Sequence, residues 1–206
     1  MRMLLVCLVL AACSSASAGP SVTETRKLDA FTGLDVSAVL DVKVAIGSPA
    51  KVEVRGPQEW LARLTTKVEK GVLVAAMPGQ FNNVPKLEML ITMPALTSID
   101  LSGVVTLTAS KLSGKSLVVD VSGVGSVVLS GAVEALRVEM SGAASIDAEK
   151  LTTSTTALEL SGAGDAIVRA TRQLDVSLSG AGNVTAYGKP ATIHKSISGV
   201  GELDLR

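Results

Sequence analysis

The stretch VDVSGVGSVVL at residues 119–129 contains the pattern that decides the fold of this chain. The pair Ser122-Gly123 stands between two runs in which apolar and polar residues alternate. Alternation with a period of two is typical of strands that bury one face, so the pair between the runs marks a corner. Five further pairs occur in the same setting: Ser102-Gly103, Ser141-Gly142, Ser161-Gly162, Ser179-Gly180 and Ser198-Gly199.

The six copies recur at a nearly constant distance. Successive glycines lie 20, 19, 20, 18 and 19 residues apart, and a period near 20 is typical of a solenoid, in which each repeat forms one rung of a stack. The residue four positions after each glycine is always apolar: Leu107, Val127, Ile146, Ala166, Val184 and Leu203. A flexible Gly/Ser linker would not keep that offset, and a propeller blade needs about 40–50 residues. The sequence therefore predicts an all-β solenoid with rungs of about 19–20 residues, in which Val127, Ile146 and Val184 share one interior column.

The serines and glycines are predicted to have a structural role at the corners. Glycine permits a sharp turn or a positive φ, and serine hydroxyls can satisfy the amides of a turn. A nucleophilic enzyme needs one activated serine, and six equivalent serines do not fit that role.

Residues 25–206 are predicted to form a single domain, with degenerate first rungs at 25–99 and regular rungs at 100–206. Residues 34–44 repeat the pattern with Ala38 in the position of the glycine. The segment 57–64 is expected to be a short helix or a loop that covers one end of the core. Further strands are expected at 51–55 and 87–93, and a hairpin over 67–74 that turns at Lys70-Gly71.

The N-terminus resembles a bacterial export signal. A basic start at residues 1–3 precedes an apolar run that is too short to span a bilayer. Leu10-Ala11-Ala12-Cys13 resembles a lipobox, which predicts a lipoprotein signal peptide at 1–12, lipidation of Cys13 and a tether at 13–24. Cleavage after Ala18 is the alternative. Ser14 follows the cysteine, and by resemblance to enterobacterial lipoprotein sorting this residue implies the outer membrane, with the lipid as the contact to that membrane.

The composition argues against several classes of function. Lysine plus arginine equals aspartate plus glutamate at 19 each, whereas nucleic-acid binding needs a basic stripe. His194 is the only histidine and is interpreted as a solvated edge residue, so no catalytic residues, metal site or cofactor are predicted.

Acidic side chains recur three positions before the glycines, at Asp100, Asp120, Glu139 and Glu159. Stacked rungs would place them about 4.8 Å apart, where like charges repel. The sequence favours splayed, solvated side chains, with a bound cation as the alternative, and marks this row as a candidate binding surface.

Residues 25–206 resemble the auto-transporter adhesin head GIN domain family. The resemblance rests on Arg26–Phe31, on the strand end Met93–Leu96 and on the tandem Ser-Gly-x-Gly rungs. It implies a right-handed parallel β-helix on an exported, often lipid-anchored bacterial protein, and it carries no catalytic residues.

The expected function is a non-catalytic adhesin or interaction scaffold of the cell envelope that binds a glycan or a protein. The alternatives are an enzyme acting on envelope polysaccharide and a structural module that self-associates. In the last case a homodimer would form through the exposed solenoid end, because open strand edges can pair with another chain.

Overall fold

A computed structural model describes residues 19–79 and 83–206. The signal peptide predicted at 1–12 and the lipidation site predicted at Cys13 lie outside the described residues. The described residues form fifteen strands and one short helix. Their bounds are β1 Ser21–Arg26, β2 Gly33–Ser37, β3 Val39–Ile46, β4 Lys51–Pro57, α1 Gln58–Leu61, β5 Thr65–Glu69, β6 Val72–Ala76, β7 Glu88–Met93, β8 Ser98–Leu101, β9 Val104–Val121, β10 Val124–Met140, β11 Ala143–Leu160, β12 Ala166–Leu178, β13 Val184–Tyr187, β14 Thr192–Ile197 and β15 Leu203–Leu205.

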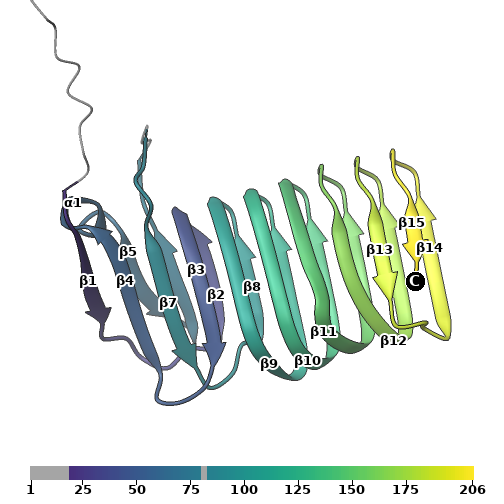
Figure 1. Cartoon of the computed structure of the whole chain (residues 1–206), viewed down its shortest axis with the longest axis horizontal. Coiled ribbons are helices and arrows are strands. Elements are labelled where there is room, and N and C mark those ends of the chain that lie inside the picture. The colour runs from purple at the N-terminus through teal and green to yellow at the C-terminus, as the bar shows by residue number, and fades with distance from the viewer. Residues whose placement is uncertain (1–18, 80–82) are drawn as a thin grey trace, which may run out of the picture.

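The strands stack as a parallel β-solenoid of about five turns, so the predicted fold class is confirmed. Figure 1 shows the rungs side by side along the long axis of the molecule. Each rung supplies one strand to each of two layers. Layer A contains β5, β6, β2, β8, the second halves of β9–β12, and β14; layer B contains β1, β4, β7, β3, the first halves of β9–β12, β13 and β15.

The core lies between the two layers and is made of columns of aliphatic side chains. Val127 pairs in register with Ile146, Ile146 with Ala166, and Ala166 with Val184. Each of the four is at most 1% exposed, which confirms the predicted interior column. Full burial of a valine or isoleucine side chain contributes about 1.5–3 kcal/mol. Burial of the apolar side chains at this repeated offset therefore stabilises the stacking of the rungs.

The degenerate copy at 34–44 stacks directly on the regular rungs. Val36 pairs with Leu101 and Val39 with Val104, although residues 47–97 separate the two rungs in the chain. Those residues continue the stack on the other side of the degenerate copy. β6 and β7 pair in parallel with β2 and β3, while β4 and β5 pair antiparallel with β7 and β6.

At the N-terminal end of the solenoid, α1 and the residues after it pack against the core. Leu61 and Leu64 are at most 2% exposed and belong to the core, so the segment expected to cover one end of the core does so. The predicted hairpin is also confirmed, with φ of 49° at Lys70 and 79° at Gly71.

The predicted tether is too long at its C-terminal end. Residues 21–24 belong to β1, which pairs antiparallel with β4, with Ser21 opposite Pro57 and Glu24 opposite Val54. The free edge of β4 provides main-chain partners for this segment, and its alternating side chains suit a strand with one face toward the protein.

Candidate functional site

The predicted acidic row is present on the outer face of layer A. Asp100 pairs in register with Asp120, Asp120 with Glu139, and Glu139 with Glu159. Ser177 continues the row on β12, and Asp35 extends it at the other end, opposite Asp100. The stacking of parallel strands thus brings side chains from six separate rungs into one line.

The acidic row and the serine corners line the same shallow groove. Its volume is about 370 Å³. The groove runs across five rungs, with the acidic row and Ser177 along one side and four of the corner serines along the other. Its lining residues are Asp100, Asp120, Val121, Ser122, Glu139, Met140, Ser141, Glu159, Leu160, Ser161, Ser177 and Ser179.

The first half of the groove has carboxylates facing carboxylates. Partial burial raises the pKa of Asp100, and the negative charges of Asp35 and Asp120 raise it further. Partial burial and the charge of Glu139 likewise raise the pKa of Asp120, against a smaller opposing effect of Arg137. Both groups therefore hold a proton more tightly than an isolated aspartate does.

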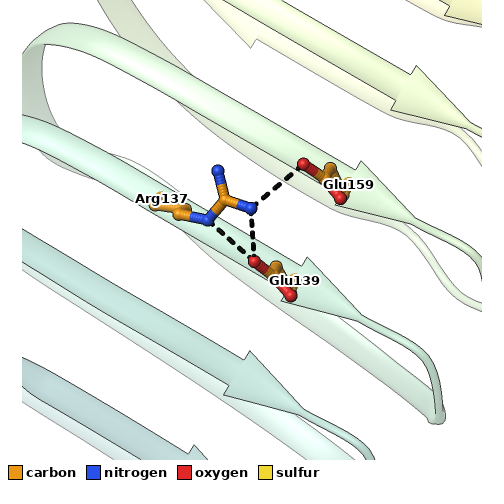
Figure 2. A network of polar contacts seen from close by, with 3 residues as sticks. All are labelled: Arg137, Glu139 and Glu159. Carbon is orange, nitrogen blue, oxygen red and sulfur yellow. Dashed lines mark hydrogen bonds and ion pairs between the residues drawn. The ribbon is translucent and has the colours of Figure 1, made fainter.

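Beside the second half of the groove lies a cation, Arg137, that the sequence analysis missed. Arg137 Nε donates to Glu139 Oε1 at 2.7 Å, and Arg137 Nη2 donates to Glu159 Oε1 at 3.2 Å (Figure 2). The hydrogen bond to Glu139 is the main cause of the raised pKa of Arg137. A guanidinium can bridge two carboxylates because its donors form a fixed planar fork.

Two signals in the sequence point to the residues that were missed. Arg137 lies two positions before Glu139, so both side chains leave the same face of β10. Asp35 stands three positions before Ala38, which is the offset of the other acidic residues once Ala38 takes the place of the glycine.

The serine corners are held by main-chain hydrogen bonds, and the prediction that serine hydroxyls satisfy the turn amides is wrong. The amides of Ser122 and Gly123 donate to Leu101 O at 2.9 and 3.1 Å. The same pattern repeats at Ser141-Gly142, Ser161-Gly162, Ser179-Gly180 and Ser198-Gly199. The hydroxyl of Ser161 instead donates to a carbonyl, Met140 O, at 3.4 Å. Since carbonyls of the preceding rung accept from these amides, the turns do not depend on the hydroxyls, and four of these exposed serines line the groove: Ser122, Ser141, Ser161 and Ser179.

The corner glycines are required by the close approach of successive rungs. A Cβ added at Gly123 would lie 2.1 Å from Gly103 O, and the six corner glycines give such distances of 1.9–2.1 Å to a carbonyl oxygen of the preceding rung. Gly103 itself stacks on Ala38 of the degenerate copy. None of the six glycines has a positive φ among the described residues, so stacking distance, and not the left-handed backbone, demands glycine here.

His194 lies at the far end of layer A, on β14. Its Nδ1 is 2.7 Å from Asp175 Oδ1, and the side chain is 69% exposed. The contacts with His194, and secondarily with Gln173, lower the pKa of Asp175. Within residues 19–79 and 83–206, no group of three or more His, Cys, Asp or Glu side chains is placed to hold a metal ion.

Comparison with known proteins gives the same architecture. The family model "Putative auto-transporter adhesin, head GIN domain" matches residues 30–190. None of the curated proteins matches the chain. In the part of the chain that the structure describes, no helix has the length and hydropathy to cross a membrane.

Solved structures of bacterial proteins share the fold. A putative adhesin from Bacteroides fragilis has a TM-score of 0.74 at 21% identity, covering 91% of this chain and 98% of its own. A putative adhesin from Parabacteroides distasonis has a TM-score of 0.56 at 18% identity, with 91% and 98% covered. A putative lipid binding protein from the same species has a TM-score of 0.54 at 17% identity, with 91% and 97% covered.

Proposed function

Because this chain belongs to the family described as "Putative auto-transporter adhesin, head GIN domain", we propose that it is a non-catalytic adhesin or interaction scaffold of the cell envelope. In this proposal the acidic groove of layer A is the binding face. The protein is exported and anchored through a lipid on Cys13, with the outer membrane as its site.

The observation that carries the proposal is the groove itself. Four carboxylates and five serines from successive rungs line one hollow of about 370 Å³. The groove contains four acidic residues, and Arg137 beside them pairs with only two. A ligand that fits this surface carries positive charge, because complementary potentials select partners and speed their encounter.

A basic protein segment fits the groove better than a neutral glycan. Sugar rings commonly pack against aromatic side chains, and the residues that line the groove include no phenylalanine, tyrosine or tryptophan. Lysine and arginine side chains can instead reach the carboxylates and the serine hydroxyls of several rungs at once. Charge-assisted hydrogen bonds of this kind are roughly twice as strong as neutral ones.

The test uses the full-length chain on an array of peptides that differ in charge and on an array of glycans. We expect binding to lysine-rich and arginine-rich peptides that falls as salt is raised. The double variant Asp120→Asn/Glu139→Gln should lose most of this binding. Glu134→Gln, which removes an exposed carboxylate outside the groove, should retain it.

Other outcomes distinguish the alternatives. Release of reducing sugar ends from an envelope polysaccharide would identify an enzyme and overturn the proposal. Binding to neutral glycans that survives the double variant would show that the ligand sits elsewhere. Equal loss of peptide binding in the double variant and in Glu134→Gln would show that general surface charge, and not the groove, is responsible.

A further inference from the structure

An apolar ladder runs along the corner edge of the solenoid. The residue that follows each corner glycine from Gly103 to Gly180 is apolar and exposed, and so is the residue that follows Ala38 in the degenerate copy. Val104 and Val124 are 52% and 53% exposed. The side chains stack in register from rung to rung, about 4.8 Å apart. The apolar ladder consists of Val39, Val104, Val124, Ala143, Ala163 and Ala181.

The first described strand begins at the same edge. Ser21 of β1 lies opposite Pro57, the last residue of β4, and β4 runs antiparallel to β7, so its end lies beside the start of β7. β7 begins at Glu88, which pairs with Asp41, two residues after Val39. The start of β1 is therefore level with the apolar ladder, three strands away from β3 along layer B.

The position of Cys13 limits how far this edge can lie from a membrane. The proposed lipid site stands six residues before Gly19, the first described residue, and six residues span at most about 20–22 Å. An anchored chain can therefore bring the corner edge or the N-terminal end of the solenoid against the bilayer. The N-terminal end carries the charged side chains of Glu24, Arg26 and Glu59, whereas the apolar ladder carries none. The corner edge is thus the face better suited to lipid.

We propose that the apolar ladder docks on the bilayer surface when the protein is anchored, with its valines and alanines in contact with lipid. The inference rests on the lipid anchor of the proposed function. A patch one side chain wide is too small for a stable protein interface, which buries roughly 800 Å² on each partner. A bilayer needs less, because the anchor holds it at a high effective concentration beside the ladder. The outer face of layer A then stands off the membrane, which leaves the acidic groove open to its ligand.

The segment between β6 and β7 projects from the same edge and supports this orientation (Figure 1). Its described residues from 77 to 79 and from 83 to 85 are all uncharged. The residues that line a hollow of about 530 Å³ at this edge include Met77, Gly79, Val39, Val104 and Val124. Lipid that contacts the ladder can therefore enter this hollow and meet apolar side chains of the projecting segment as well.

The test uses the lipidated chain in phosphatidylcholine vesicles, with a polarity-sensitive fluorophore on one introduced cysteine. The lipid occupies the thiol of Cys13, and Cys7 is lost with the predicted signal peptide, so the introduced thiol alone is labelled. The ladder variant is Ala143→Cys. The matched control is Ala132→Cys, at an exposed alanine of β10 at the opposite corner. We expect the probe at position 143 to emit at shorter wavelength and to be quenched by lipids with a quencher on the acyl chain, and the probe at position 132 to show neither effect.

Charges placed in the ladder should undo the docking. With the probe at position 143, the double change Val104→Asp/Val124→Asp should lower the docking equilibrium at least about tenfold, or 1.4 kcal/mol, because a charge is unfavourable in lipid. The matched double change Ser113→Asp/Thr152→Asp, at exposed residues in register with Ala132, should leave the signal unchanged. Both chains should still sediment with the vesicles through the anchor.

The possible failures are distinguishable. A parent chain that does not sediment with the vesicles would overturn the anchor and this inference with it. Sedimentation together with equal emission and quenching at positions 143 and 132 would overturn the inference alone and leave the anchor in place. Peptide binding by the acidic groove is measured separately and depends on neither result.

Discussion

Asp120 of β9 lies in register with Asp100 of β8, and both carboxylates have raised pKa values. One rung further, Glu139 accepts a hydrogen bond from Arg137, which also reaches Glu159. The charge of the acidic row is therefore distributed unevenly along its length. Its first part consists of carboxylates beside carboxylates, and its second part contains a compensating cation.

Replacement of Asp120 by asparagine should stabilise the fold at neutral pH. The change removes a charge that repels Asp100 and Glu139, and cross-strand pairs of this kind are worth about 0.2–1 kcal/mol. The measurement is urea unfolding at pH 7, where the midpoint should rise with an unchanged slope. A lower midpoint would show that Asp120 makes a stabilising contact in the fold.

The advantage of Asp120→Asn should shrink in acid. A carboxylate whose pKa is raised by folding binds its proton more tightly in the folded chain. Its contribution to stability is therefore complete below the unfolded value of about 3.9 and is lost as the pH rises through the folded pKa. The difference between variant and parent should be largest at pH 7 and close to zero near pH 3.5.

Replacement of Arg137 by methionine should destabilise the fold. Met keeps the apolar stem but leaves Glu139 and Glu159 without their shared cation beside Asp120. Because Arg137 and both glutamates are half-exposed, we expect a small loss of stability in low salt. Urea unfolding in 0.05 M and 1 M NaCl checks this, since screening should reduce the loss. A loss of equal size in both buffers would assign the effect to packing.

Replacement of Gly123 by alanine should be among the most damaging single changes in the core rungs. The new Cβ would lie 2.1 Å from Gly103 O, so the rungs must move apart and lose the amide bonds to Leu101 O. We expect a cost of about 2–4 kcal/mol in thermal or urea unfolding. Gly47→Ala is the control, because its nearest contact would be Thr92 Cγ2 at 3.4 Å. Similar small losses in both variants would contradict the close-stacking account.

Replacement of Cys13 by alanine should abolish labelling of the protein by a radioactive fatty acid and release it from the membrane fraction. The expectation follows from the lipobox at residues 10–13 and from the hydrophobic contribution of acyl chains to anchoring. Cys7→Ala is the control, since Cys7 belongs to the predicted signal peptide, and its labelling should be unchanged. Persistent labelling of the Cys13→Ala chain would remove the lipid anchor from the proposed function.

The regular rungs could be predicted in detail because their pattern is local. Strand alternation around each Ser-Gly pair, and the constant spacing of the pairs, are visible within a window of about 20 residues. The row Asp100, Asp120, Glu139 and Glu159 followed from the same alignment. Arg137 was not found, because its offset has no charged equivalent in the neighbouring rungs, where Val118 and Ala157 occupy the same place.

The first rungs could be predicted only in part. The hairpin at Lys70-Gly71 and the strand at 51–55 have local signals, and the structure contains both. The antiparallel pairing of β1 with β4, and of β4 with β7, has no such signal. A strand that alternates in the same way can pair in either direction, so the direction is decided by which edges the folded chain leaves free.

By itself, the amino-acid sequence determined that this protein is a solenoid, since an apolar residue at a constant offset can be buried only by stacking one rung on the next. It also determined which side chains form the core columns and the acidic row within residues 100–206. Only the tertiary structure decided that the rung at 34–44 packs against the rung that begins at 98, which brings Asp35 beside Asp100. The physical reason is that burial of apolar surface stabilises the contact between two complementary rungs however far apart they are in the chain. The entropy cost of closing the intervening loop grows only slowly with the length of that loop.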